Sequence, residues 1–128
     1  MSGEKKRAKS ERLIEEAIKA RGYIFPEWEF VCRLDPDFFE SYNNLYTSSL
    51  GKSGELSIKV KEFIALALLA FRGSSTDVLV SHMKRAMDDG ATKEELLEAF
   101  EAALPAGGAP TFFNGLKALL SLEEKSSD

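Results

Sequence analysis

The feature that most constrains the fold is a long apolar segment near the middle of the chain. After Glu62, every residue in the stretch Phe63–Phe71 is apolar. Ser57 is a suitable N-cap before this stretch and Gly73 a suitable stop after it, so a helix is predicted over about Ile58–Arg72. A helix that is apolar on nearly every side is buried in a helical bundle or in an oligomer.

Signals for helix starts and ends recur along the rest of the chain, and no stretch alternates like a β-strand. Thr92 and Glu95 have the spacing of a capping box, and Gly90 before them is placed as a helix end. Ser74 and Asp77 have the same capping-box spacing one helix earlier. We therefore predict an all-α fold. The other expected helices cover about Lys5–Arg21, a short segment from Pro26, an aromatic segment after Pro36 and about Pro110–Leu122. The chain is expected to break over Pro105–Pro110 and to end in a disordered tail over Glu123–Asp128.

Length and charge indicate what kind of domain the chain forms. A chain of 128 residues corresponds to a single domain, with its core expected at about 25–122 and a helical extension at 1–24. The net charge of -4 argues against a nucleic-acid partner, which favours a basic face. The apolar run is shorter than the roughly 20 residues of a membrane helix. The charged N-terminus lacks the apolar centre of a secretory signal, so no membrane partner is expected either.

The chain contains one cysteine, Cys32, and one histidine, His82. A lone cysteine forms no intrachain disulfide, which fits a reducing compartment, and we predict a cytoplasmic location. These two residues are too few for the usual histidine and cysteine ligand sets of a metal ion, and no acidic spacing indicates a carboxylate site. No metal site is therefore expected.

An aromatic stripe follows the Asp35–Pro36 break. Its side chains recur at roughly helical spacing, which places them on the core or on a subunit interface. A surface that faces a ligand is the second interpretation. The stripe consists of Phe38, Phe39, Tyr42, Leu45 and Tyr46.

Glu62 is the charged residue that precedes the apolar run. At about 100° per residue its side chain shares a face with Leu66 and Leu69. Two interpretations are open. The carboxylate either lies inside the bundle, where it can take part in proton transfer, or stays at the rim, where the helix dipole favours negative charge.

His82 lies on the next predicted helix, at the edge of the apolar face that carries Leu79, Met83 and Ala86. A lone histidine at such an edge is either a structural residue or a general acid and base near neutral pH. Two consecutive antiparallel helices would bring it close to Glu62. Ser74, Ser75 and Ser81 are not in the strand–turn–helix setting of a nucleophile, and the first two are better explained as helix caps.

Several segments together resemble the carboxymuconolactone decarboxylase family, whose members share the alkylhydroperoxidase D-like helical fold. The resemblance extends over about Leu56–Leu120, half of the chain, and rests on the order and spacing of its parts. It implies a helical bundle that forms a homo-oligomer, commonly a trimer or a hexamer. The segments are Leu56–Ala67, Ser81–Ala86, Asp89–Leu96, Gly107–Pro110 and Asn114–Leu119.

The peroxide-reducing branch of that family carries a Cys-x-x-Cys pair ahead of the histidine. Counting back from His82 places Ser75 and Val78 at the two cysteine positions. Counting forward from Glu62 places Ser74 and Asp77 there, because the loop between the helices is one residue longer. A hydroxyl cannot replace a thiolate in disulfide exchange, so thiol-dependent peroxidase activity is the less favoured hypothesis.

The resemblance to the branch without cysteines implies a carboxy-lyase that needs no cofactor and acts on a small carboxylated lactone or a related carboxylic acid. It makes His82 and Glu62 the candidate catalytic pair. Lys84 and Arg85 follow on the same helix, where they either attract the substrate carboxylates or, as the favoured interpretation, form a solvated face. The alternative, from another class of function, is a non-catalytic oligomeric protein that binds a small molecule or serves as a scaffold.

Overall fold

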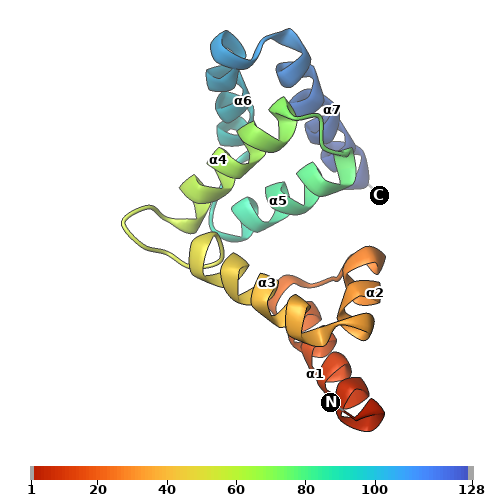
Figure 1. Cartoon of the computed structure of the whole chain (residues 1–128). Helices are drawn as coiled ribbons and strands as arrows, with labels where there is room; N and C mark the ends of the chain where they lie inside the picture. The colour runs from red at the N-terminus through yellow and green to blue at the C-terminus, as the bar shows by residue number, and fades with distance from the viewer. Residues whose placement is uncertain (1, 127–128) are drawn as a thin grey trace. The chain divides into compact units, whose positions relative to one another are not determined.

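The computed structural model describes residues 2–126, and every regular element in this range is an α-helix (Figure 1). The prediction of an all-α fold is confirmed. The helices are α1 (Gly3–Arg21), α2 (Pro26–Leu34), α3 (Pro36–Ser49), α4 (Ile58–Phe71), α5 (Thr76–Asp88), α6 (Lys93–Gly107) and α7 (Ala109–Ser126).

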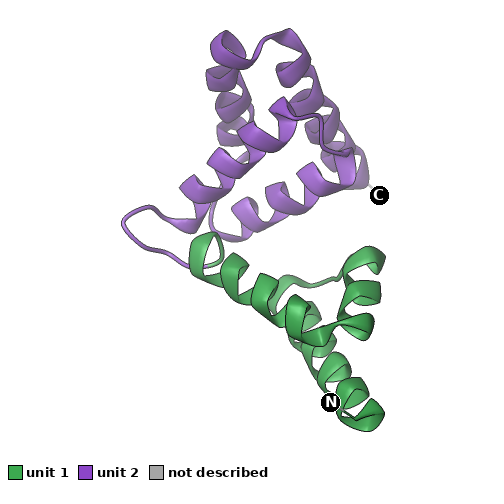
Figure 2. Ribbon diagram, viewed as in Figure 1, with its two compact units in different colours: residues 1–51 green, residues 52–128 purple. Residues whose placement is uncertain are grey.

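The chain divides into two compact units, coloured separately in Figure 2. Unit 1 comprises residues 1–51 and contains α1, α2 and α3, and unit 2 comprises residues 52–128 and contains α4 to α7. Each unit has its own cluster of buried apolar side chains. Among the described residues, no helix is both long enough and apolar enough to cross a membrane.

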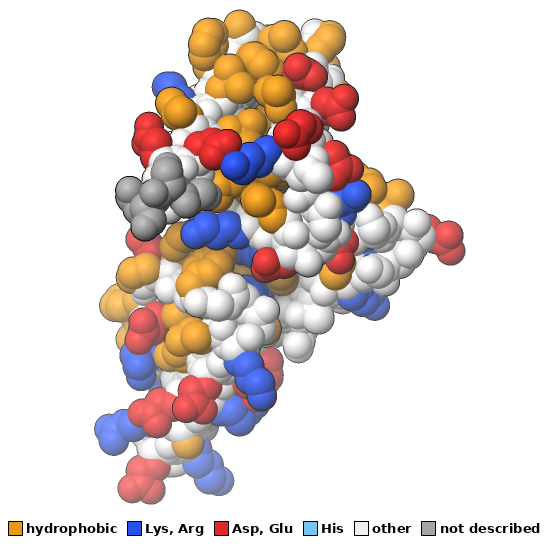
Figure 3. Space-filling model, turned by 180° about the vertical axis from the view of Figure 1, so that it is seen from behind, with side chains coloured by type: hydrophobic (Ala, Val, Ile, Leu, Met, Phe, Trp, Pro, Cys, Tyr) orange, Lys and Arg blue, Asp and Glu red, His pale blue; other side chains and the backbone are white. Residues whose placement is uncertain are grey.

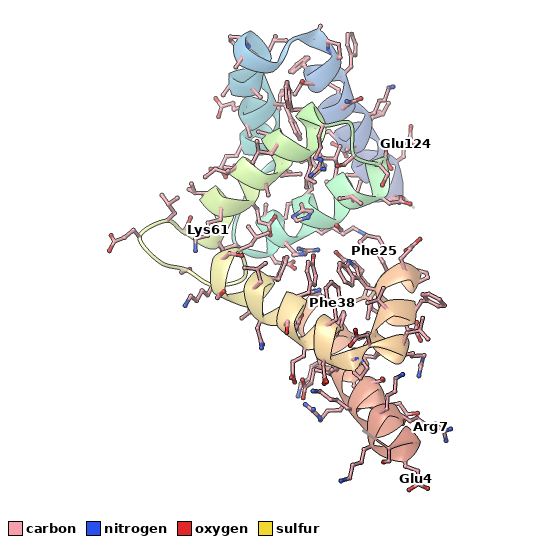
Figure 4. The ribbon with its side chains drawn as sticks, viewed as in Figure 1. Glu4, Arg7, Phe25, Phe38, Lys61 and Glu124 are labelled. Atoms are coloured by element: carbon pink, nitrogen blue, oxygen red, sulfur yellow. The ribbon has the colours of Figure 1, made fainter. Side chains whose placement is uncertain are left out.

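The core of unit 1 forms where α1, α2 and α3 pack together. The aromatic stripe of α3 is split between the interior and the surface: Phe39 is fully buried, whereas Phe38 is 57% exposed (labelled in Figure 4). Tyr42 stacks on Trp28 with ring centroids 4.0 Å apart, and this contact joins α3 to α2. The prediction of a core role therefore holds for Phe39. The buried side chains of this core are Leu13, Ile14, Ala17, Cys32 and Phe39.

In unit 2, the predicted central helix is present as α4. The Ser57 hydroxyl accepts a hydrogen bond from the Val60 amide at 3.2 Å, and the helix ends next to Gly73, whose φ of 75° lies in the left-handed region. At the start of α4, Lys61 (labelled in Figure 4) donates from Nζ to the Lys52 carbonyl at 2.9 Å, which ties the preceding loop to the helix. Leu66 and Ala70 of α4 are fully buried.

The α5 N-terminus differs from the prediction. The capping box expected for Ser74 and Asp77 is wrong, because the N-cap is Ser75, whose hydroxyl accepts from the Val78 amide at 3.4 Å. The capping box of α6 is confirmed: Thr92 Oγ1 accepts from the Glu95 amide and Glu95 Oε1 from the Thr92 amide, each at 3.1 Å.

The C-terminal part also differs from the prediction. The helix α6 continues through Pro105, which lies in its last turn, and the chain turns at Gly108, with a φ of 87°. Glu123 belongs to α7 and pairs with Lys93 of α6 at 2.7 Å, and Leu122 before it is buried. These contacts explain why residues 123–126 are helical rather than a disordered tail. The remaining tail residues, 127–128, lie outside the described part.

Candidate active site

Glu62 lies in the interior of unit 2. Its side chain is 1% exposed, and Leu66, one turn further along α4, is fully buried. Of the two sequence-based interpretations, the interior position is correct and the rim position is wrong. An ionised carboxylate in such surroundings needs polar or charged partners, because burial removes the water that would otherwise stabilise it.

His82 is the first of these partners. Its Nδ1 atom lies 2.6 Å from Glu62 Oε2, a short hydrogen-bonding distance. The turn at Gly73 returns the chain so that α5 packs against α4, which places the two side chains opposite each other. The His82 side chain is 14% exposed, whereas the Glu62 side chain is 1% exposed. Glu62 and His82 are therefore in direct contact.

Arg85 is the second partner of Glu62, and the favoured interpretation of Arg85 as part of a solvated face is wrong. Its Nη1 atom lies 3.9 Å from Glu62 Oε1, and its side chain is only 17% exposed. Lys84 is exposed, as expected for a solvated face, but Arg85 is not. The spacing in the sequence could have indicated that Arg85 lies near Glu62, because residues three apart on a helix, such as His82 and Arg85, are neighbours on one face.

The arrangement assigns a different partner to each carboxylate oxygen of Glu62. When the carboxylate is ionised, Nδ1 of His82 carries the proton and donates it to Oε2, and Nε2 is then the ring nitrogen available for other chemistry. A guanidinium is always charged, so Arg85 adds a permanent positive charge beside this pair. The three side chains can therefore hold a proton at a defined ring atom.

The serines near this site have structural roles. Ser75 caps α5, and the Ser81 hydroxyl donates to the Val78 carbonyl at 2.7 Å. Counting along the sequence places either Ser75 and Val78 or Ser74 and Asp77 at the cysteine positions of the peroxide-reducing branch, and none of these residues carries a thiol. Cys32 is buried in unit 1. Within residues 2–126, no cluster of three or more His, Cys, Asp or Glu side chains is placed to hold a metal ion.

The site lies within a region of the chain that matches a known protein family. The sequence profile of the Carboxymuconolactone decarboxylase family matches residues 36–121, a range that starts in α3 and includes Glu62, His82 and Arg85. The chain belongs to this family. With Cys32 as its only cysteine, it is a member without the Cys-x-x-Cys pair. A search of curated proteins found no match.

Solved structures of this family have the same fold. A provisionally assigned carboxymuconolactone decarboxylase from Burkholderia xenovorans LB400 is similar with a TM-score of 0.75 and 19% identity, over 95% of this chain and 96% of that one. A ligand-free carboxymuconolactone decarboxylase family protein from Legionella pneumophila is similar with a TM-score of 0.66 and 24% identity, over 94% and 96%. At these identities the likeness establishes the fold alone.

Proposed function

We propose that this family member is a cofactor-independent carboxy-lyase that decarboxylates a small carboxylated lactone or a related acid. The observation that carries the proposal is the direct contact between His82 and the buried Glu62, 2.6 Å apart. Membership of the family and the absence of a thiol pair support a reaction that depends on acid–base groups rather than on disulfide exchange.

The chemistry needs little from the protein. When the carbon–carboxylate bond of an unsaturated lactone acid breaks, carbon dioxide leaves and the electron pair moves into the ring carbonyl, which becomes an enolate. A proton is then delivered to carbon, and the net result replaces the carboxylate by hydrogen. Imidazolium Nε2–H of His82 supplies this proton and is recharged from water, while Glu62 stabilises the imidazolium through Nδ1–H.

A turnover assay tests this proposal. Release of carbon dioxide and loss of ultraviolet absorbance are measured with γ-carboxymuconolactone and with related lactone acids, for the wild type, His82→Ala and Lys84→Ala. Lys84 lies on the same helix but is exposed, so Lys84→Ala should match the wild type. We expect His82→Ala to lose the activity. Unchanged turnover in His82→Ala would overturn the mechanism, and a silent wild type would favour the non-catalytic binding or scaffold function.

Peroxide reduction through thiols has less support. It requires a reactive thiolate with a second thiol, whereas Cys32 is fully buried and is the only cysteine in the chain. Burial also raises the pKa of the Cys32 thiol, which disfavours the thiolate form.

A second copy of the chain is the protein partner that we propose. One face of α4 carries an apolar row whose exposed fractions range from 36% to 64%. These residues are spaced four, four and three apart, so they form a continuous stripe along the helix. A stripe without charged residues is suited to the same stripe on another copy, because a two-fold interface pairs a surface with itself. The row consists of Val60, Ile64, Leu68 and Phe71.

A further inference from the structure

Arg85 has a position that the proposed acid–base pair does not by itself explain. It follows His82 by about one turn on α5, and both side chains point to the same buried carboxylate. His82 takes Oε2 at 2.6 Å and Arg85 lies 3.9 Å from Oε1. A long cationic side chain on a solvated face would extend into water, whereas this one is 17% exposed.

We propose that Arg85 is a positioning residue that sets the orientation and the tautomer of His82 through Glu62. The guanidinium attracts the negative charge of the carboxylate from the Oε1 side, so Oε2 is left to accept the Nδ1 proton of His82. With Nδ1 protonated in this way, Nε2 is the ring nitrogen that is not engaged by Glu62 and is left for a substrate. The catalytic part of this inference rests on the proposed function, but the tautomer does not.

The alternative role for Arg85 is direct binding of the substrate carboxylate. The 3.9 Å separation between Nη1 and Oε1 favours a role that acts through Glu62, because the two charges already lie within ion-pair distance without a substrate. At 3.9 Å the contact is an ion pair, so it acts through the positive charge of Arg85, which a lysine ammonium on a shorter side chain reproduces only in part.

The single histidine of the chain allows a direct test of this inference. His82 is the only histidine, so in a tag-free, ¹⁵N-labelled protein every imidazole nitrogen signal belongs to this residue. A two-bond proton–nitrogen correlation spectrum distinguishes the protonated ring nitrogen from the bare one without any substrate. The wild type, Arg85→Met and Arg85→Lys are compared, with Lys84→Met as the control that removes a neighbouring exposed charge.

We expect the wild type and Lys84→Met to show the tautomer protonated at Nδ1, Arg85→Met to show a mixture, and Arg85→Lys to restore it in part. In the turnover assay, kcat should fall by up to about 100-fold in Arg85→Met with little change in KM. An unchanged tautomer in Arg85→Met would overturn the inference. If KM were also raised in that variant, the result would indicate that Arg85 binds the substrate directly. If Arg85→Met does not fold, the partial loss in Arg85→Lys decides the matter.

The two proposals can fail separately. If the wild type turned over no lactone acid but Arg85→Met changed the tautomer of His82, the positioning role would stand and the carboxy-lyase proposal would be rejected. Normal turnover with an Arg85-independent tautomer would do the reverse.

Discussion

The ring of Phe100 in α6 lies directly against the backbone of Gly115 in α7. A β-carbon at Gly115 would come within 2.5 Å of the Phe100 ring atoms Cδ1 and Cγ, far closer than van der Waals contact. Phe100 is fully buried, so its ring cannot move away into solvent. The close approach of α6 and α7 therefore depends on the missing side chain of Gly115.

We expect Gly115→Ala to lower the free energy of unfolding by about 1–3 kcal/mol, the usual cost of overpacking a core. Alanine favours helix by up to about 1 kcal/mol over glycine, which offsets only part of this loss. Urea unfolding followed by circular dichroism measures the difference. Lys117→Ala, at an exposed position of the same helix, is the control and should change stability little. A Gly115→Ala variant as stable as the wild type would contradict the packing argument.

The contact between Lys59 and Glu95 predicts how unit 2 responds to acid. Lys59 Nζ donates to Glu95 Oε2 at 3.0 Å, and this bond, followed by the one from the Thr92 amide, lowers the pKa of Glu95. A carboxylate whose pKa is lower in the folded state stabilises the fold above its unfolded pKa, about 4.3. That contribution is lost as the pH falls through the folded value.

Thermal unfolding between about pH 6 and pH 3 tests this prediction. Glu95→Gln should show a shallower loss of Tm in acid than the wild type, because glutamine has no proton to gain. Glutamine also keeps the capping box, so the helix start is preserved. Glu94→Gln removes the same charge from the same helical turn at an exposed position and should follow the wild-type curve. Identical acid slopes for Glu95→Gln and the wild type would refute this role for Glu95.

Local signals explain most of what the sequence predicted correctly. The start of α4 at Ser57, its end before Gly73 and the capping box of Thr92 each depend on a few neighbouring residues. Pro105 was misinterpreted because proline usually disrupts a helix interior, whereas it lies here in the last turn of α6, close to the helix end.

The candidate site depended on contacts between helices, which spacing along the chain does not determine. Sequence periodicity placed Glu62 and His82 on the right faces, but only the packing of α4 on α5 brings Nδ1 to within 2.6 Å of Oε2. Arg85 was assigned to the solvated face with Lys84 because both are cationic and adjacent. Their side chains leave the helix about 100° apart, and that difference places Arg85 beside Glu62.

Cys32 should react slowly with thiol reagents in the folded protein. Its side chain is fully buried in unit 1, and burial raises the pKa of the thiol above its ordinary value. Because the unfolded chain loses the thiol proton first, stability should fall as the pH rises through the unfolded pKa of about 8.5. Labelling with a disulfide reagent at pH 8, with and without denaturant, tests the burial.

The alkaline loss of stability has its own control. In Cys32→Ala the part of the decline near the thiol pKa should disappear, although the variant will be less stable at every pH because a buried side chain is shortened. Labelling of the native protein as fast as that of the denatured protein would show that the thiol is accessible, contrary to its position in the core.

The apolar row on α4 predicts an oligomer that a single charge can weaken. Leu68 and Phe71 are 60% and 64% exposed, and the row that they share with Val60 and Ile64 contains no charged side chain. Light scattering on a sizing column should therefore find the wild type as a multiple of the 14.2 kDa chain, and Leu68→Glu as a smaller species. In the variant, burial of the row would desolvate the new carboxylates and bring like charges together, which costs several kcal/mol.

Leu120→Glu places the same charge on α7, where Leu120 is 62% exposed, and should leave the mass unchanged if α4 forms the interface. A wild type that stays monomeric at millimolar concentration would show that the row does not bind a second copy.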